Sequence, residues 1–174
     1  MSTLAPMKIT DPVQFGKVGL LVGGDSAERE VSLDGGKAVH AALQRQGVSV
    51  KVFDGARSLF RAIEASEVDR VFNLMHGPGG EDGAIQGALQ LMKVPVTGAG
   101  LLGSALSMDK VHSKWVWERR GIDTPPFVLL KQGEELSGQV DNDWGLPLFV
   151  KPAGLGSSIC ITKVDRKSTR LNSS

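Results

Sequence analysis

Short apolar runs alternate with segments of helical periodicity, and this alternation constrains the fold more than any other feature of the sequence. The apolar runs lie near residues 18–22, 49–54, 70–75 and 94–97. Helical segments lie between them, near residues 32–46, 58–65 and 85–92. Strands that alternate with helices are typical of parallel sheets with right-handed crossovers. We therefore expect a doubly wound parallel α/β domain over residues 17–109.

The pattern changes after residue 109. Met108, Val111 and Trp115 have the spacing of one helical face, and an extended segment is expected from residue 125. Two short strands, 148–151 and 159–164, are predicted to pair antiparallel across a glycine-rich loop. This pairing indicates the start of an α+β domain over residues 110–164. The last ten residues, 165–174, combine basic and small polar side chains, so we expect a non-native, disordered tail there.

Charge and cysteine content exclude several classes of protein. Twenty Lys and Arg against 19 Asp and Glu give a net charge of +1, which provides no overall field for nucleic acid or anionic lipid. The single Cys excludes an intramolecular disulfide and fits a reducing compartment. No apolar stretch approaches the roughly 20 residues of a membrane helix. We expect a cytoplasmic protein that binds neither nucleic acid nor membrane.

The loop after the first predicted strand contains a cluster of charged side chains. Glu28, Arg29 and Glu30 precede the first helix, and the loop leaves the sheet edge at which parallel α/β domains bind ligands. A carboxylate there can hold a substrate ammonium group, but acidic residues before a helix also simply favour its dipole. Gly23 and Gly24 lack the spacing of a dinucleotide-binding loop.

The loop after the third predicted strand begins with His76, which is followed by four glycines in seven residues. Glycine lets a backbone approach a ligand closely, so His76 is either a catalytic or a structural residue. Asp82 is a candidate cap for the next helix. Metal binding is disfavoured, because the three histidines are far apart in the sequence and Cys160 has no paired cysteine.

A third loop, residues 151–158, has the composition of a phosphate-binding loop. Lys151 can supply a point charge, and Gly154 and Gly156 allow backbone N–H groups to approach phosphate oxygens. Ser157 and Ser158 add hydroxyl donors. The spacing is not that of a Walker A motif, and an ordinary Gly-Ser hairpin remains the alternative.

Four segments together closely resemble the D-alanine–D-alanine ligases: GGDSAEREVSL (23–33), HGPGGEDGAIQGALQL (76–91), VTGAGLLGSALSMDK (96–110) and LFVKPAGLGSS (148–158). The resemblance runs from about residue 17 to 164. It implies a Rossmann-like pre-ATP-grasp domain followed by a truncated ATP-grasp domain. It also implies phosphorylation of one D-alanine by ATP, attack by the amine of a second D-alanine, a role in peptidoglycan synthesis, and a homodimer.

The resemblance also implies roles for individual residues. Glu28 matches the carboxylate that holds the ammonium group of the first D-alanine; His76 and Ser157 match neighbours of the same substrate. Lys110 and Lys151 match lysines that contact ATP phosphates, and the loop that contains Gly154, Gly156 and Ser158 would close over those phosphates. The magnesium ligands of the family are expected in a C-terminal part that this sequence does not contain, and no metal ligand is assigned here.

Three interpretations follow for the chain as a whole. The first is an N-terminal fragment of a D-alanine–D-alanine ligase, inactive by itself. The second is another carboxylate–amine ligase of the same superfamily, such as a D-alanine–D-lactate ligase. The third is a non-catalytic dimerisation module. This chain departs from the family's pattern in its glycine-rich loop. Family members commonly carry other residues at the positions of Gly154, Leu155, Ile159 and Cys160.

Overall fold

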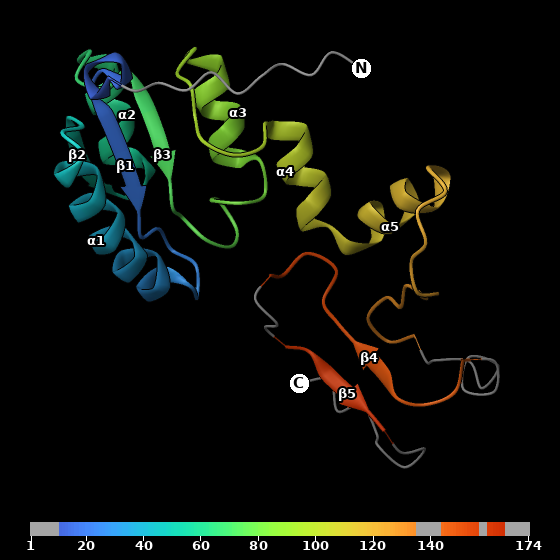
Figure 1. Cartoon of the computed structure of the whole chain (residues 1–174). Coiled ribbons are helices and arrows are strands. Elements are labelled where there is room, and N and C mark those ends of the chain that lie inside the picture. Colours follow the sequence, from blue (N-terminus) through green and yellow to red (C-terminus); the bar gives the residue numbers. More distant parts are fainter. Residues whose placement is uncertain (1–10, 135–143, 157–159, 166–174) are drawn as a thin grey trace. The chain divides into compact units, whose positions relative to one another are not determined.

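The computed structural model describes residues 11–134, 144–156 and 160–165 (Figure 1). The chain divides into two compact units, 1–106 and 107–174. The sequence pattern places a domain boundary close by, after residue 109. Within the described ranges, no helix is long and apolar enough to cross a membrane.

The first unit is built on a parallel sheet. After a short 3-10 helix, Pro12–Phe15, the strands are β1 (Val18–Val22), β2 (Val50–Asp54) and β3 (Arg70–Asn73), in the order β2-β1-β3. Val18 is in register with both Val50 and Arg70. The helices are α1 (Arg29–Arg45), α2 (Ala56–Glu64) and α3 (Ala84–Leu91). The predicted parallel α/β fold is confirmed.

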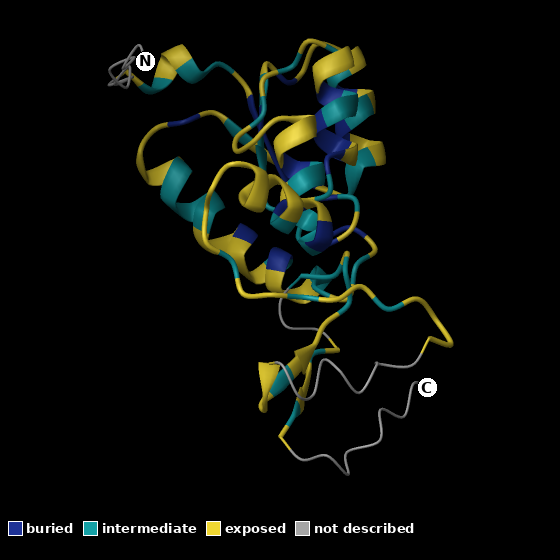
Figure 2. Cartoon of the chain, turned by 90° about the vertical axis from the view of Figure 1, so that its right-hand side faces the viewer, coloured by how far each residue is buried: buried dark blue, intermediate teal, exposed yellow. Residues whose placement is uncertain are grey.

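Helices cover both faces of this sheet. Leu21 faces a buried cluster that includes Leu59 of α2 and Leu89 of α3. The next residue, Val22, points to the other face, where a Cβ on Gly36 of α1 would lie 2.5 Å from its Cγ1. Alternation along β1 therefore separates α1 from α2 and α3, which is the doubly wound arrangement. In Figure 2 the buried residues gather among these strands and helices.

Two element boundaries in the first unit differ from the prediction. Helix α1 begins at Arg29 rather than near residue 32, because the backbone already turns at Ser26, whose carbonyl accepts from the Arg29 N–H at 3.1 Å. The predicted fourth strand is a single parallel bridge between Val71 and Val96. A Pro at position 95 has no N–H to extend that pairing.

The second unit is less regular. Helix α4 (Leu101–Met108) leads into it, and α5 (Lys110–Arg119) follows. The predicted continuous helical face is wrong, because Asp109 takes an extended conformation and caps α5 through the N–H groups of residues 111 and 112. Residues 122–131 form neither helix nor strand. Strands β4 (Leu148–Val150) and β5 (Thr162–Val164) pair antiparallel, as predicted.

Candidate ligand site at the carboxyl edge of the sheet

The loops that follow β1 and β3 are joined by direct contacts. The Ser26 hydroxyl donates to the carbonyl of His76 at 2.8 Å and accepts from the Glu28 N–H at 3.2 Å. A Cβ on Gly77, where φ is +69°, would lie 3.0 Å from Glu28 Oε2. The Glu28 carboxylate therefore lies against the loop that begins at His76. The structure brings these two loops together, as the strand order of the sequence predicts.

Glu81 organises the loop around His76. One of its carboxylate oxygens accepts from the Gly77 N–H at 2.8 Å, and the other lies 3.4 Å from His76 Nδ1. The Glu81 carboxylate thus holds both the backbone turn at Gly77 and the Nδ1 edge of the His76 ring. Asp82 is not the N-cap residue considered from the sequence, because Gly83 occupies that position; its carboxylate accepts from the N–H groups of Ala84, at 3.0 Å, and Gly79, at 2.8 Å. Glu81 was not identified from the sequence, because a carboxylate in a loop gives no local signal of its partners.

Asn73 and Gly80 complete the scaffold of this loop. Asn73 Nδ2 donates to the Gly80 carbonyl at 2.8 Å, and Asn73 Oδ1 accepts from the Met75 N–H at 3.0 Å. A Cβ on Gly80 would lie 2.6 Å from the carbonyl atoms of Met75. The backbone at Gly80 therefore approaches Met75, just after β3, more closely than any other residue type would allow.

An ion pair fixes the first loop from its other side. The Arg29 guanidinium donates to both carboxylate oxygens of Asp54, at 2.7 and 2.6 Å, and to the Gly24 carbonyl at 3.1 Å. This hydrogen bonding lowers the pKa of Asp54. The pair ties α1 to the end of β2, and no sequence pattern indicates it, because the two residues are 25 positions apart.

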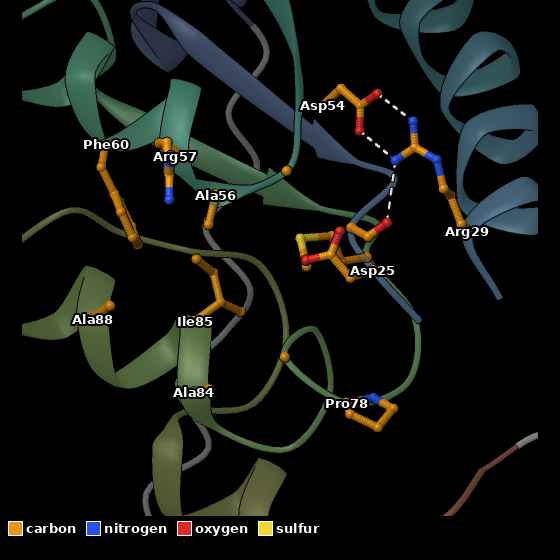
Figure 3. A pocket seen from close by; sticks show the side chains of 14 residues that line it. Asp25, Arg29, Asp54, Ala56, Arg57, Phe60, Pro78, Ala84, Ile85 and Ala88 are labelled. Atoms are coloured by element: carbon orange, nitrogen blue, oxygen red, sulfur yellow. Dashed lines mark hydrogen bonds and ion pairs between the residues drawn. The ribbon is translucent and has the colours of Figure 1, made fainter. Parts of the chain in front are cut away.

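The Arg29–Asp54 pair also forms one wall of a pocket of about 600 Å³ at this edge (Figure 3). Apolar side chains of α2 and α3 line its opposite side, among them Phe60, Ile85 and Ala88. The pocket therefore has a charged side and an apolar side, and neither Glu28 nor His76 lines it. Its remaining lining residues are Gly24, Asp25, Gly55, Ala56, Arg57, Met75, Pro78, Gly79 and Ala84.

In the second unit, Lys110 is joined to the glycine-rich loop. Its backbone N–H donates to the Ala153 carbonyl at 2.9 Å, and its ammonium group donates to the Pro152 carbonyl at 2.9 Å and to that of Leu155. The structure therefore brings together a lysine and a loop that the resemblance assigns to ATP phosphates. The carbonyl groups of the loop, rather than its N–H groups, face Lys110.

The other residues that were predicted to contact phosphate have different surroundings. Lys151 is exposed, and its Nζ lies 5.8 Å from the centroid of the Phe149 ring. A Cβ on Gly154 would meet no atom within 4 Å, so open space surrounds that position, and Gly156 is partly buried. Ser157 and Ser158 lie outside the described residues. Two ammonium groups beside an open loop suit phosphate oxygens.

Carboxylates near the loops do not form a metal cluster in the part of the chain that the structure describes. Among those residues, no group of three or more His, Cys, Asp or Glu side chains could hold a metal ion. Cys160 is exposed and has no disulfide partner. The described side chains therefore offer no magnesium site to which a step could be assigned.

The fold and the loop contacts define an α/β domain with a candidate ligand site at the carboxyl edge of a parallel sheet. Two family models match the chain: D-ala D-ala ligase N-terminus at residues 53–99, and D-ala D-ala ligase C-terminus at residues 116–173. The chain belongs to the D-alanine–D-alanine ligase family. The second match extends to residue 173 and so includes most of the segment predicted to be a foreign tail. Of that segment, residues 166–174 lie outside the described residues.

Individual relatives agree with this membership. D-alanine–D-alanine ligase B of Xanthomonas campestris pv. campestris is 46% identical over 170 residues, which are 94% of this chain and 53% of that protein. The D-alanine–D-alanine ligase of Paraburkholderia phytofirmans is 47% identical over 161 residues, or 91% and 51% of the two chains. The chain therefore spans about half the length of the curated relatives it matches.

Solved structures give the same result. The D-alanine–D-alanine ligase of Bacillus anthracis has a TM-score of 0.75 and 32% identity, over 87% of this chain and 50% of that one. A structure of the Bacillus anthracis ligase complexed with ATP has a TM-score of 0.74 and 30% identity over the same shares. The fold of this chain is therefore that of about half of a D-alanine–D-alanine ligase.

Proposed function

We propose that this chain is the half of a D-alanine–D-alanine ligase that binds the first D-alanine and part of the ATP phosphates. One observation supports this most directly: the Glu28 carboxylate lies against Gly77, in the loop that begins at His76, at the carboxyl edge of β1 and β3. A carboxylate between two loops at that edge is suited to hold a small ammonium group.

The proposed reaction has two steps. The carboxylate of the first D-alanine attacks the γ-phosphorus of ATP, which forms an acyl phosphate and releases ADP. The amine of the second D-alanine then attacks the acyl carbon, and phosphate leaves as the peptide bond forms. Glu28 holds the ammonium group of the first D-alanine throughout, so the reacting carboxylate is oriented rather than activated chemically.

The second unit would handle the phosphates. Lys110 and Lys151 supply positive charge where phosphoryl transfer develops negative charge. The loop with Gly154, Gly156, Ser157 and Ser158 would exclude water from the acyl phosphate, which water destroys. The Lys110 ammonium group has three N–H donors, and the loop carbonyls of Pro152 and Leu155 accept from it. Magnesium is part of the proposal as the partner of ATP, and no described residue is assigned to it.

Self-association is a second candidate function. Leu91 at the end of α3 is 86% exposed and Leu102 in α4 is 69% exposed. Exposed leucines contribute to a contact with another protein surface when they lie in one contiguous apolar patch. A homodimer through these helices would fit the dimerisation module considered from the sequence. Light scattering of the wild type and of a variant with both Leu91→Asp and Leu102→Asp tests for this homodimer. Equal molecular masses of the two proteins would exclude these leucines from a dimer contact.

The ligase proposal is tested by completing the enzyme. Residues 1–164 are joined to the remaining, C-terminal part of the Xanthomonas campestris ligase, and the product is assayed by mass spectrometry with ATP, magnesium and D-alanine, in the cytoplasmic pH range. We expect D-alanyl-D-alanine and one phosphate for each peptide bond formed. Competition with D-lactate tests the alternative superfamily activity. A folded chimera that binds ATP but forms no product with either acceptor would contradict the proposal.

A further inference from the structure

The hydrogen-bond ladder between β1 and β3 is interrupted at one position. In a parallel pair, one residue uses its N–H and its carbonyl to bond two residues of the neighbouring strand, one on each side of its partner. Leu21 is in register with Asn73, and the Leu74 N–H donates to the Leu21 carbonyl at 2.8 Å. The next bond of the series would run from the Gly23 N–H to the Leu74 carbonyl.

The Ser32 hydroxyl occupies the place of that missing bond. It accepts from the Gly23 N–H at 2.8 Å and donates to the Leu74 carbonyl at 2.6 Å. Ser32 lies in the first turn of α1 and is fully buried. One hydroxyl therefore satisfies the Gly23 N–H, just after β1, and the Leu74 carbonyl, just after β3. At the same time it separates these two backbone segments.

This separation falls at the point where both functional loops begin. Gly23 opens the loop that leads to Glu28, and Leu74 is two residues before His76. The Ser32 N–H also donates to the Glu28 carbonyl at 3.1 Å. Ser32 is thus bonded to the backbone of Glu28 on one side and to the strand that ends in His76 on the other.

We propose that Ser32 is a positioning residue, whose hydroxyl sets the gap between the Glu28 and His76 loops by taking the place of a strand-to-strand hydrogen bond. Without the hydroxyl, the Gly23 N–H and the Leu74 carbonyl would pair directly and the two loops would approach each other. The nature of the ligand, a small amino acid, rests on the proposed function, whereas the gap is a property of the fold.

The test compares Ser32→Ala with Ser104→Ala in the 174-residue chain, labelled for NMR. Ser104, in α4, is a matched control, because it is also buried and its hydroxyl contacts the carbonyl of Ala99, just before that helix, rather than a backbone group after β1 or β3. Scalar coupling across hydrogen bonds reports the partner of the Gly23 N–H. Titration with D-alanine, followed at Gly77, reports the site. Ser32→Thr restores the hydroxyl and adds a buried methyl group.

In Ser32→Ala we expect a new coupling between Gly23 N and the Leu74 carbonyl carbon, and shifted resonances at Glu28 and Gly77. The D-alanine dissociation constant should rise about tenfold or more, since misplacing a binding group by about 1 Å has effects of this order. Ser104→Ala should leave it unchanged. Ser32→Thr should retain binding even where its melting temperature falls, which separates the hydroxyl from packing.

The outcomes are distinct for the two proposals. Unchanged loop resonances in Ser32→Ala, or wild-type affinity in that variant, would overturn the role of Ser32. A wild-type chain that does not respond to D-alanine at any concentration would count against the proposed first-substrate site. In that case the Gly23 coupling and the loop resonances still decide whether Ser32 sets the gap.

Discussion

Two charged groups that are adjacent in the sequence have different surroundings at the sheet edge. The Arg29 guanidinium donates to both carboxylate oxygens of Asp54 and to the Gly24 carbonyl, and so holds the start of α1 to the end of β2. The Glu28 carboxylate instead lies against Gly77 of the neighbouring loop. Arg29 is therefore a structural anchor, and Glu28 is the carboxylate proposed to hold the substrate ammonium group.

Replacement of Glu28 should affect the first amino acid far more than ATP. In the completed ligase, Glu28→Gln removes one member of a charge pair with the substrate ammonium, which costs about 2 kcal/mol or more, roughly thirtyfold in affinity. Steady-state kinetics should show a raised KM for the first D-alanine and an unchanged KM for ATP. Glu30→Gln, at an exposed position in the same turn, is the matched control. Equal effects of the two substitutions would contradict the role of Glu28.

The Arg29–Asp54 pair predicts a pH dependence of stability. Because Arg29 lowers the pKa of Asp54 in the folded protein, the pair stabilises the fold above the ordinary aspartate pKa of about 4. This contribution is lost as the pH falls through the lowered pKa. Thermal unfolding of wild type and Asp54→Asn should differ at pH 7 and converge at the acidic end. The contribution is modest, since both side chains are partly exposed. A difference that grows with acid would refute this assignment.

At the scale of elements, the ends of helices position the site. The break between α4 and α5 places Lys110 at the first position of α5, from which its ammonium group reaches the carbonyls of the glycine-rich loop. Asp109 makes this break by capping α5. Hydrogen bonds from the backbone N–H and the ring of His112 lower the pKa of Asp109, so the cap is charged at neutral pH.

Removal of this cap should loosen α5 and release Lys110. Asp109→Ala should cost about 1 kcal/mol of local stability, the usual loss for an N-cap residue. Amide exchange at Val111 and His112 should speed up, because their N–H groups lose the carboxylate acceptor. Asp109→Asn keeps an acceptor and should stay close to wild type. The effect should disappear as acid protonates Asp109, since its pKa is lowered in the folded state. Unchanged exchange in Asp109→Ala would show that the cap is dispensable.

At the scale of the whole molecule, the two units differ in how much apolar surface they bury. The main buried cluster, which contains Leu21, Leu59, Val71, Ile85 and Leu89, lies wholly within the first unit. In the second unit, Trp115, Trp117, Ile122 and Phe149 are all exposed. Apolar exposure of this extent favours aggregation or contact with further protein surface.

The first unit should therefore fold without the second. A chain of residues 1–106 should unfold in one cooperative transition, at a temperature close to that of the first unit within the 174-residue chain, because its core needs no residue beyond 106. Calorimetry of the two chains provides the comparison. The longer chain should also scatter more light on heating. Loss of cooperative unfolding in 1–106 would show that the second unit is needed for the core.

The 174-residue chain alone should not make the dipeptide. It spans about half the length of its curated relatives, and its described residues include no group that could hold a metal ion against the phosphates. Phosphate release from ATP with saturating D-alanine and magnesium should stay at background, whereas the chimera completed with the Xanthomonas campestris half should turn over. Turnover by the 174-residue chain comparable to that of the chimera would contradict this expectation.

The sequence by itself determined the parallel sheet and the loops that form the site. Apolar runs and helical periodicity report which residues face a core, so β1, β3 and α3 could be placed from local pattern alone. The order of strands and helices then required Glu28 and His76 to emerge at one edge. The resemblance added the family and the expected role of Lys110, which no spacing indicated, and it agreed with the phosphate contact that the composition of the loop suggested for Lys151.

Only the tertiary structure decided how that edge is held open. The Ser32 hydroxyl bonds a carbonyl 42 residues away, and Arg29 pairs with a carboxylate 25 residues away. Asp109 interrupts a helical pattern that Met108 and Val111 would otherwise continue. Local periodicity carries no information about such partners, because they depend on strand register and on which face of the sheet each helix covers. Hydrogen bonds between distant residues become definite only when the sheet fixes both ends in space.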